Sequence, residues 1–301
     1  MLAACAAAAF AWAEVPLRNG RVKPHATPEA AAAALASGGS VLLLPGAASA
    51  DECDALVQAC SVTLDAGQRL TRLPSSAAAA RAAETDDAFN GDPHADAPLS
   101  QLPADADVIC DAILKRVLSL IDEQLSPVAV AQFGTARLSD LYAAGELEYA
   151  EREPAVNVYG LGGEFPPHED HQALTVIVPL SGHGGGGTGF WLREEEGGYA
   201  AEADEEAAVV AWEAEDQDEW EEVAAAAWET EDQDEWEDEW EDEEWRGMER
   251  PATPPSMVLR PKRGTAMLFS GEVLHAGMPV EHASRVVLVA SFSGVQFWPD
   301  A

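Results

Sequence analysis

From residue 128 onward, the sequence consists of short apolar runs separated by glycine- and proline-rich turns, and this pattern constrains the fold more than any other feature. Short strands that follow one another without intervening helices are typical of a β-sandwich or barrel, and not of a parallel α/β sheet. We therefore expect residues 128–293 to form a β core. The runs interpreted as strands are 128–133, 155–159, 174–180, 190–192, 257–259, 264–269 and 285–292.

The preceding segment, residues 27–127, has helical patterns instead. Thr27 and Pro28 are typical of a helix start, and apolar residues after Ser49 recur at helical spacing. We therefore predict an α+β domain over residues 27–293, with N-terminal helices packed on the β core. The expected elements are helices over 27–38, 49–60 and 105–124, a strand at 41–44, and a loop over 73–103.

The charge of the chain is concentrated in one segment. Asp and Glu number 54 against 17 Lys and Arg, and residues 194–250 hold 27 of these acids with only two arginines. The excess of acids argues against a nucleic-acid-binding protein, because phosphate contacts need clustered cations. We predict that residues 194–250 are a mostly disordered insert, since like charges repel and little can be buried there.

The acidic insert also carries an internal near-repeat. Four tryptophans recur every eight residues, a spacing that places them on no single helix face. Two interpretations stay open: a solvated surface loop, or an interaction segment for a basic or calcium-bearing partner that uses the aromatic rings as anchors. The four tryptophans are Trp212, Trp220, Trp228 and Trp236.

The N-terminus is apolar and rich in alanine. Residues 1–13 end in an Ala-x-Ala pattern, as a secretory signal would, but lack a basic leading region; an alanine-rich helix is the alternative. A signal would direct the chain to the secretory pathway or endoplasmic reticulum. No apolar run reaches the roughly 18 residues of a transmembrane helix. The four cysteines are too few for a disulfide-built scaffold, and none forms a CxxC pair.

Three residues have the types and order of a metal centre. His168 and Asp170 are two apart, so on a strand their side chains would point to the same face. His275 follows the predicted strand at 264–269 and could supply a third ligand. Two histidines with one carboxylate form the ligand set of non-haem Fe(II) oxygenases, in which the remaining metal positions stay open.

Arg285 follows His275 by ten residues and opens a strongly apolar strand. A buried arginine is costly unless it meets an anion, and a guanidinium binds a carboxylate through two parallel hydrogen bonds. Because Arg285, Val287 and Val289 alternate on one face, we expect Arg285 to point into the β core. A dicarboxylate cosubstrate would supply the anion.

These motifs resemble those of the 2-oxoglutarate- and Fe(II)-dependent dioxygenases, and specifically the prolyl 4-hydroxylase-like catalytic domain. The resemblance covers residues 155–193 and 257–293 well and 38–60 loosely. It implies a double-stranded β-helix, or jelly roll, with the acidic insert in a loop between its halves. The matching segments are 159–170, which ends in Pro-Pro-His-Glu-Asp, 186–190, 261–269, 275–280 and Arg285.

The resemblance also implies an activity. His168, Asp170 and His275 would be the catalytic iron ligands, and Arg285, helped by Tyr159, would bind the distal carboxylate of 2-oxoglutarate. The enzyme would use O₂ to hydroxylate a C–H bond, most simply of a peptidyl proline or similar side chain, with release of succinate and CO₂ and with L-ascorbic acid as reductant. The prolyl hydroxylases usually have lysine at the position of Arg285, so this residue favours the wider superfamily over the prolyl subtype.

Two other functions stay open at this point. The first is a non-catalytic jelly-roll module that binds a ligand or another metal, because such a fold supports binding as well as catalysis. The second places the function in the acidic insert, as a protein-interaction segment. Only the dioxygenase hypothesis explains the ordered pattern of His168, Asp170, His275 and Arg285. Its substrate would be a protein, a peptide or a small molecule.

Overall fold

The structure, a computed structural model, describes residues 12–18, 20, 22–23, 27–60, 69–85, 101–192, 208–211, 251 and 253–295. Within this part, no helix is both long and apolar enough to cross a membrane. The helices are α1 (Pro28–Ala36), α2 (Ala50–Cys60), α3 (Ser76–Thr85), α4 (Ala104–Gln124), α5 (Ser126–Phe133) and α6 (Leu138–Ala144).

The strands form two sheets, whose pairings are antiparallel with one exception. The eight-stranded major sheet has the order β1 (Ala13–Pro16), β2 (Ser40–Leu44), β11 (Ala266–Phe269), β7 (Leu174–Pro179), β13 (Arg285–Gly294), β5 (Ala155–Tyr159) and β3 (Leu70–Pro74), with β4 (Leu147–Tyr149) also paired to β13. The five-stranded minor sheet has the order β6 (Phe165–His168), β12 (His275–Met278), β8 (Gly187–Phe190), β10 (Met257–Arg260) and β9 (Ala208–Ala211).

Consecutive core strands alternate between the two sheets, except that β8 and β10 follow each other in the minor sheet. If the strands from β5 to β13, without β9, are numbered one to eight, the major sheet contains them in the order 6-3-8-1 and the minor sheet in the order 2-7-4-5. This winding is that of a jelly roll. The expected α+β class is therefore confirmed, and the strand order brings the start of β12 beside the end of β6.

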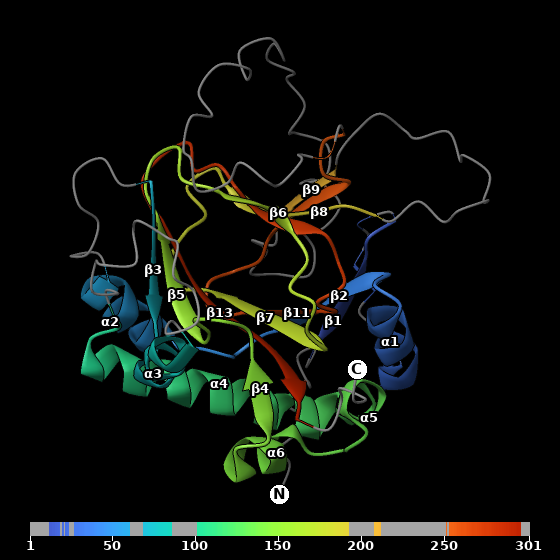
Figure 1. Cartoon of the computed structure of the whole chain (residues 1–301). Helices are drawn as coiled ribbons and strands as arrows, with labels where there is room; N and C mark the ends of the chain where they lie inside the picture. The colour runs from blue at the N-terminus through green and yellow to red at the C-terminus, as the bar shows by residue number, and fades with distance from the viewer. Residues whose placement is uncertain are drawn as a thin grey trace, which may run out of the picture.

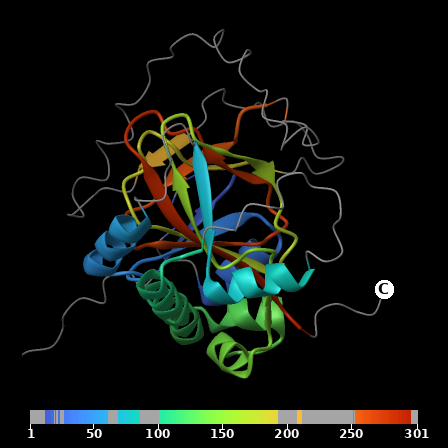
Figure 2. The same ribbon diagram turned by 60° about the vertical axis from the view of Figure 1, so that its left-hand side comes forward.

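The major sheet is buried on both faces, which explains the continuous apolar runs in its strands. Val287 and Val289 of β13 face the minor sheet, whereas Val286 and Leu288 face the helices. Figure 1 shows α4, α5 and α6 along the side of the major sheet that is opposite β6 and β8, and Figure 2 shows the same green helices grouped below the sheets. The helices thus cover one face of the major sheet. Its other face points toward the minor sheet and bounds the space between the two sheets.

The expected N-terminal helices are present, and their caps follow the sequence. The Thr27 hydroxyl accepts a hydrogen bond from the Ala30 N–H at 3.3 Å. At the start of α2, the Glu52 carboxylate accepts from the Ser49 N–H at 2.8 Å, and the Ser49 hydroxyl accepts from the Glu52 N–H at 3.3 Å. This reciprocal pair is a capping box. Arg116 of α4 binds the same carboxylate through two 2.8 Å contacts and thereby joins the two helices.

The strand predicted at 128–133 is wrong, because these residues form helix α5. The alternation of valine and alanine suggested a period of two. In the structure Ser126 and Pro127 begin a new helix, and the buried residues are Val128, Ala129 and Gln132, which share a helix face. This face lies beside α1, and Gly134 in the left-handed conformation ends the helix.

The loop predicted over 73–103 is also wrong in part. Residues 70–74 form β3, which adds an edge strand to the major sheet, and residues 76–85 form α3. Three alanines of α3, Ala78, Ala79 and Ala82, are buried. The alanine run of α3 contains no large apolar side chain, so it lacks the apolar spacing that identifies the other helices. Residues 86–100 lie outside the described part.

The predictions for the acidic insert and for the N-terminal signal fall largely outside the described residues. Within the acidic insert the structure describes only β9, which pairs in parallel with β10, so this stretch is a strand and not disordered. Residues 1–11 of the predicted signal are not described, whereas Ala13 is buried in β1. Cys53, Cys60 and Cys110 are buried and free of disulfides.

Candidate metal centre and adjoining cavity

The two histidines of the predicted centre lie directly opposite each other in the minor sheet. His168 ends β6 and His275 begins β12, and the register pairs these two residues. Their ring centroids are 4.3 Å apart. Phe190 of β8 is the next residue in the same cross-strand row, and its ring packs on the far side of His275. The sheet register therefore brings together side chains that are 107 residues apart in the sequence.

Each histidine ring is oriented by a backbone carbonyl. Nδ1 of His168 lies 2.8 Å from the Pro166 carbonyl oxygen, and Nδ1 of His275 lies 2.9 Å from that of Val273. A ring that donates its Nδ1 proton to a carbonyl presents the Nε2 lone pair on its other side. Burial lowers the pKa of His275 to about 4, against the opposing effect of Asp170, so this imidazole is neutral at pH 7.

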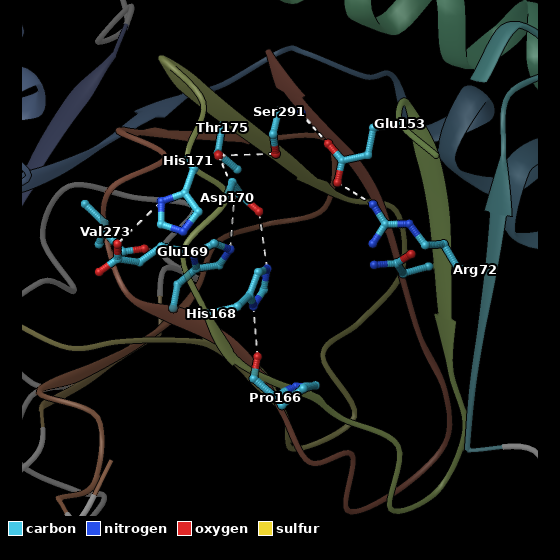
Figure 3. Close-up of polar contacts among 12 residues, drawn as sticks. Arg72, Glu153, Pro166, His168, Glu169, Asp170, His171, Thr175, Val273 and Ser291 are labelled. Atoms are coloured by element: carbon cyan, nitrogen blue, oxygen red, sulfur yellow. Dashed lines mark hydrogen bonds and ion pairs between the residues drawn. The ribbon is translucent and has the colours of Figure 1, made fainter. Parts of the chain in front are cut away.

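Asp170 completes the group from the loop after β6. Its Oδ1 lies 3.2 Å from Nε2 of His168, and its Oδ2 lies 3.6 Å from Nε2 of His275. Burial would raise the pKa of Asp170, but the two histidines and a hydrogen bond from the Thr175 hydroxyl outweigh it and hold the pKa well below its usual range. Figure 3 shows Asp170 below Thr175, with the His168 ring on its other side.

The position of Asp170 corrects one detail of the prediction. The strand ends at His168, so Asp170 is not in β6 as a pattern of alternating faces had suggested. The chain turns immediately afterwards, and His171 has a positive φ of 54°. Asp170 nevertheless reaches the same point as His168, since the Thr175 hydroxyl fixes its carboxylate at the start of β7.

Together, His168, Asp170 and His275 could hold a metal ion. One ligand atom from each residue lies within 4.8 Å of the others. Two imidazole nitrogens and one carboxylate oxygen form a set that suits Fe(II) and leaves further coordination positions free. The role of the three residues as iron ligands stays a prediction, whereas their proximity is a feature of the fold.

A cavity between the two sheets extends from the histidines to Arg285. Both histidines line it on the minor-sheet side, and β5, β7 and β13 supply apolar and polar walls from the major sheet. The side chains that line it are those of Arg72, Glu153, Asn157, Tyr159, Phe165, His168, Ile177, Thr188, His275, Arg285, Val287 and Val289.

Arg285 is 2% exposed and points into this cavity, as its alternation with Val287 and Val289 predicted. Its Nη2 donates to the Thr188 hydroxyl at 2.9 Å, and its guanidinium carbon lies 5.1 Å from the centroid of the Tyr159 ring. Nε and Nη1 are buried without a hydrogen-bond partner, and no described carboxylate forms an ion pair with them. A buried guanidinium with unsatisfied donors is a site for an anion.

Tyr159 lies beside Arg285, because the two residues are paired across β5 and β13. Its hydroxyl is 3.5 Å from Nδ2 of Asn157. Gly277 provides the space for the Tyr159 ring, since a Cβ at that position would lie 2.9 Å from the hydroxyl oxygen. The structure thus brings all five predicted site residues, His168, Asp170, His275, Arg285 and Tyr159, to one region.

Several residues of the region were not identified from the sequence. Thr175 and Thr188 support Asp170 and Arg285, and Thr188 lies in the quoted segment 186–190, where it received no role. Arg72 and Glu153 form a partly buried ion pair at the opposite side of the cavity. No sequence signal connects these two residues, because they are 81 positions apart. Arg72 also lies between the predicted helix at 49–60 and the predicted loop at 73–103, where no element was expected.

A second group of polar side chains lies near the first. Glu169, His171 and Glu272 place one potential ligand atom each within 4.8 Å of the others. Glu169 and His171 alternate in sequence with His168 and Asp170, and Glu272 lies three residues before His275. The group lies toward the protein surface, where the His171 side chain is 69% exposed. Among the described residues, the structure therefore contains one buried and one exposed group with metal-binding residue types.

No protein-family model and no curated protein sequence matches this chain. Solved structures of prolyl 4-hydroxylases and other 2-oxoglutarate–Fe(II) oxygenases are similar to it in fold. The viral collagen prolyl hydroxylase vCPH from Paramecium bursaria Chlorella virus-1 is 14% identical, with a TM-score of 0.41, over 87% of this chain and 99% of that chain. A Pseudomonas putida prolyl-4-hydroxylase is 15% identical, with a TM-score of 0.37, over 89% and 99%.

A further similar structure is an oxidoreductase of the 2OG-Fe(II) oxygenase family from Burkholderia pseudomallei. It is 17% identical to this chain, with a TM-score of 0.39, and the match covers 89% of this chain and 92% of that one. At such identities the likeness concerns the fold alone. The function is therefore argued below from the residues of the site.

Proposed function

We propose that the protein is an Fe(II)- and 2-oxoglutarate-dependent dioxygenase that hydroxylates a C–H bond and releases succinate and CO₂. One observation carries this proposal: a buried group of two histidines and an aspartate shares a cavity with a buried guanidinium that lacks an anion. The first group fits a divalent iron, and the second fits the carboxylate of a dicarboxylate cosubstrate.

The residues present fit both groups. Each histidine has its Nδ1 engaged by a carbonyl, so Nε2 is the atom that would bind the metal, and the Asp170 carboxylate stays ionised. Fe(II) in such a site supplies the activation of O₂ for C–H hydroxylation. Two buried N–H groups of Arg285 would bind the distal carboxylate of 2-oxoglutarate, and Thr188 and Tyr159 would hold the guanidinium in place.

The walls of the cavity would exclude water from the reacting groups. Phe190 and Phe269 are fully buried, and both rings contact the ring of His275. Ile177, Val287 and Val289 form the apolar wall between the histidines and Arg285. An apolar lining strengthens electrostatic interactions inside the site and limits side reactions with water.

For the substrate, we propose a peptidyl proline or a similar side chain, with ascorbate as reductant. The support is the resemblance of segments 159–170 and 275–280 to the prolyl 4-hydroxylase-like domain. Arg285, where lysine is usual in prolyl hydroxylases, keeps other C–H substrates open. Proline-containing peptides are therefore the first, and not the only, compounds to test.

An anaerobic titration of Fe(II) and 2-oxoglutarate into the metal-free protein tests the proposal without knowledge of the substrate. We expect a visible charge-transfer band, which should vanish in His168→Ala and in Arg285→Ala. His282→Ala, a change at an exposed histidine, serves as the matched control and should keep the band. If a well-folded native protein shows no band, the dioxygenase proposal is wrong and a non-catalytic binding module becomes the better hypothesis.

A further inference from the structure

We propose that Arg72 and Asn157 bind a neutral amide group of the substrate, whereas Arg285 binds the carboxylate of the cosubstrate. This assignment rests on the proposed function and names a substrate class for the same cavity. It concerns a region that the sequence motifs do not reach, because Arg72 belongs to β3, an edge strand outside the eight core strands of the jelly roll.

The register of three neighbouring strands places these residues. Asn157 of β5 pairs with Arg72 of β3 on one side and with Val287 of β13 on the other. Two residues along, Leu70, Tyr159 and Arg285 form the adjacent row on the same sheet face. The Arg72–Asn157 pair therefore lies next to the cosubstrate-binding row, and both residues line the cavity.

The two arginines of the cavity, Arg72 and Arg285, differ in whether a carboxylate neutralises their charge. Arg72 forms an ion pair with Glu153, which is 3% exposed, and the same carboxylate accepts a hydrogen bond from the Ser291 N–H. Figure 3 shows this pair on the other side of the drawn group from His171. Arg285 has no described carboxylate partner. A carboxylate therefore finds an uncompensated positive charge at Arg285, but a neutralised one at Arg72.

The polar atoms left free at Arg72 and Asn157 define what can bind there. Nε of Arg72 is a buried donor without a partner, and Oδ1 of Asn157 is a buried acceptor without a partner. Leaving such groups unsatisfied is unfavourable, so a ligand that pairs with both gains affinity. An amide supplies both, since its carbonyl accepts from Nε and its N–H donates to Oδ1.

A single amide group is large enough to contact both Arg72 and Asn157. Directly opposed residues of antiparallel strands have Cβ atoms about 4.5–5.5 Å apart, so one planar group can reach both side chains. A carboxylate at the same place would also accept a hydrogen bond from Nε of Arg72. Its oxygens, however, cannot donate to Oδ1 of Asn157, and they would be repelled by this acceptor and by the nearby Glu153 carboxylate. The geometry therefore selects an amide over an acid, which is the choice that distinguishes a peptide-like substrate from a free amino acid.

The test compares two probes that differ only in this group, N-acetylprolinamide and N-acetylproline. Their dissociation constants are measured by calorimetry on the anaerobic protein loaded with Fe(II) and 2-oxoglutarate. We expect the native protein to prefer the amide by about tenfold, the effect of one or two net hydrogen bonds. Asn157→Leu and Arg72→Lys should each remove most of this preference.

The variants are chosen to fold and to leave the cosubstrate site intact. Arg72→Lys keeps the positive charge beside Glu153 and removes the Nε donor, while Asn157→Leu keeps the side-chain size. Arg137→Lys, the same change at an exposed position beside α6, is the matched control and should retain the preference.

The outcomes separate this assignment from the proposed function. A charge-transfer band with equal affinities for the two probes in native protein, or with a preference that survives both substitutions, overturns the assignment while the dioxygenase proposal stands. A native protein without the band overturns the dioxygenase proposal, and the amide assignment with it. A band together with a preference that both variants lose supports both.

Discussion

The end of β6 with the loop that follows it, and the start of β12 with the turn that precedes it, build two groups of potential metal ligands. His168, Asp170 and His275 point inward, whereas Glu169, His171 and Glu272 point outward, and in each group the ligand atoms lie within 4.8 Å of one another. The side chains of His275 and Asp170 are 4% and 8% exposed, against 69% for His171 and 55% for Glu272. The third members, His168 and Glu169, are each 20% exposed. The two groups are thus nearly matched in residue type and proximity, but two of the three members differ strongly in burial.

The two groups also differ in what fixes their orientation. Carbonyl oxygens hold both inward histidine rings, and the Thr175 hydroxyl holds Asp170. In the outward group, His171 Nδ1 lies 3.7 Å from Glu169 and 3.9 Å from Glu272, and the His171 and Glu272 side chains are exposed. Such side chains lose conformational freedom and hydration when they bind a metal. Preorganisation, more than ligand identity, therefore distinguishes the candidate metal centre from the outward group.

The largest effect is expected from removing an inward ligand. His275→Ala or Asp170→Asn should lower the affinity for Fe(II) by at least about 100-fold, because one of three fixed ligands is lost and the remaining two cannot hold the ion in the cavity. Calorimetry with Mn(II) as an oxygen-stable substitute measures this directly. Circular dichroism of each variant shows that the fold is retained. Unchanged metal affinity in both variants would mean that the metal binds elsewhere.

The next effect concerns Arg285, at the far end of the inward cavity. Arg285→Leu should raise the dissociation constant for 2-oxoglutarate by about 100-fold or more, because a buried charged hydrogen-bonded pair contributes about 2–5 kcal/mol when one partner is removed. Arg285→Lys should recover part of this loss through its charge. Metal affinity should stay unchanged in both variants. A fall in metal affinity without a change in 2-oxoglutarate binding would contradict the division of the cavity into two ends.

Two threonines test the supporting hydrogen bonds separately. Thr175→Val removes the donor to Asp170 and should weaken metal binding by about 10- to 100-fold, which is the usual effect of such outer contacts. Thr188→Val removes the partner of Arg285 and should instead raise the KM for 2-oxoglutarate. Each variant is the control for the other. If both changes affect the same parameter, the two hydrogen bonds do not act on separate ligands.

His183 isolates the effect of burial on a histidine outside both groups. Burial, together with the nearby charges of Arg285 and Arg260, lowers its pKa to about 4, although its Nε2 contacts the Pro261 carbonyl at 2.7 Å. The unfolded chain therefore binds a proton that the folded chain does not between pH 6.5 and about 4. The contribution of neutral His183 to the free energy of unfolding is complete above pH 6.5, and it is lost as the pH falls from 6.5 to about 4.

The resulting change in the free energy of unfolding should be about 1–2 kcal/mol between pH 6.5 and 4.5, because one pKa unit corresponds to about 1.4 kcal/mol and the ring is only partly buried. Urea denaturation of the metal-free protein at several pH values measures it. His183→Gln should have a shallower pH dependence than the native protein. Parallel pH profiles for the two proteins would show that His183 is not kept neutral by the fold.

The sequence was informative where function depends on local order and uninformative where it depends on long-range pairing. His168, Asp170, His275 and Arg285 could be identified because their types and spacing are unusual, and the apolar strands around them because both sheet faces are buried. The ion pair between Arg72 and Glu153 could not, since only the pairing of β3 with β5 brings these residues together.

The errors have equally local causes. The alternation in 128–133 has the period of a strand, but Pro127 and the packing of Val128 and Ala129 beside α1 favour a helix, so tertiary contacts override the pattern. The alanine-rich α3 contains no large apolar residue whose spacing could reveal its buried face. In both cases the missing information is which neighbour the segment packs against.

The smallest effect is expected from the outward group, and it is the sharpest test of the comparison. The double variant His171→Asn with Glu272→Gln removes two of its three ligands while keeping similar side-chain sizes. We expect less than about a threefold change in metal affinity at the inward centre, because exposed charges contribute little and are screened by solvent. The affinity for Mn(II) is measured by calorimetry at about 0.15 M salt, for the double variant and for His275→Ala in parallel. A loss in the double variant as large as that in His275→Ala would show that exposed ligands bind as well as buried ones, and that preorganisation does not distinguish the two groups.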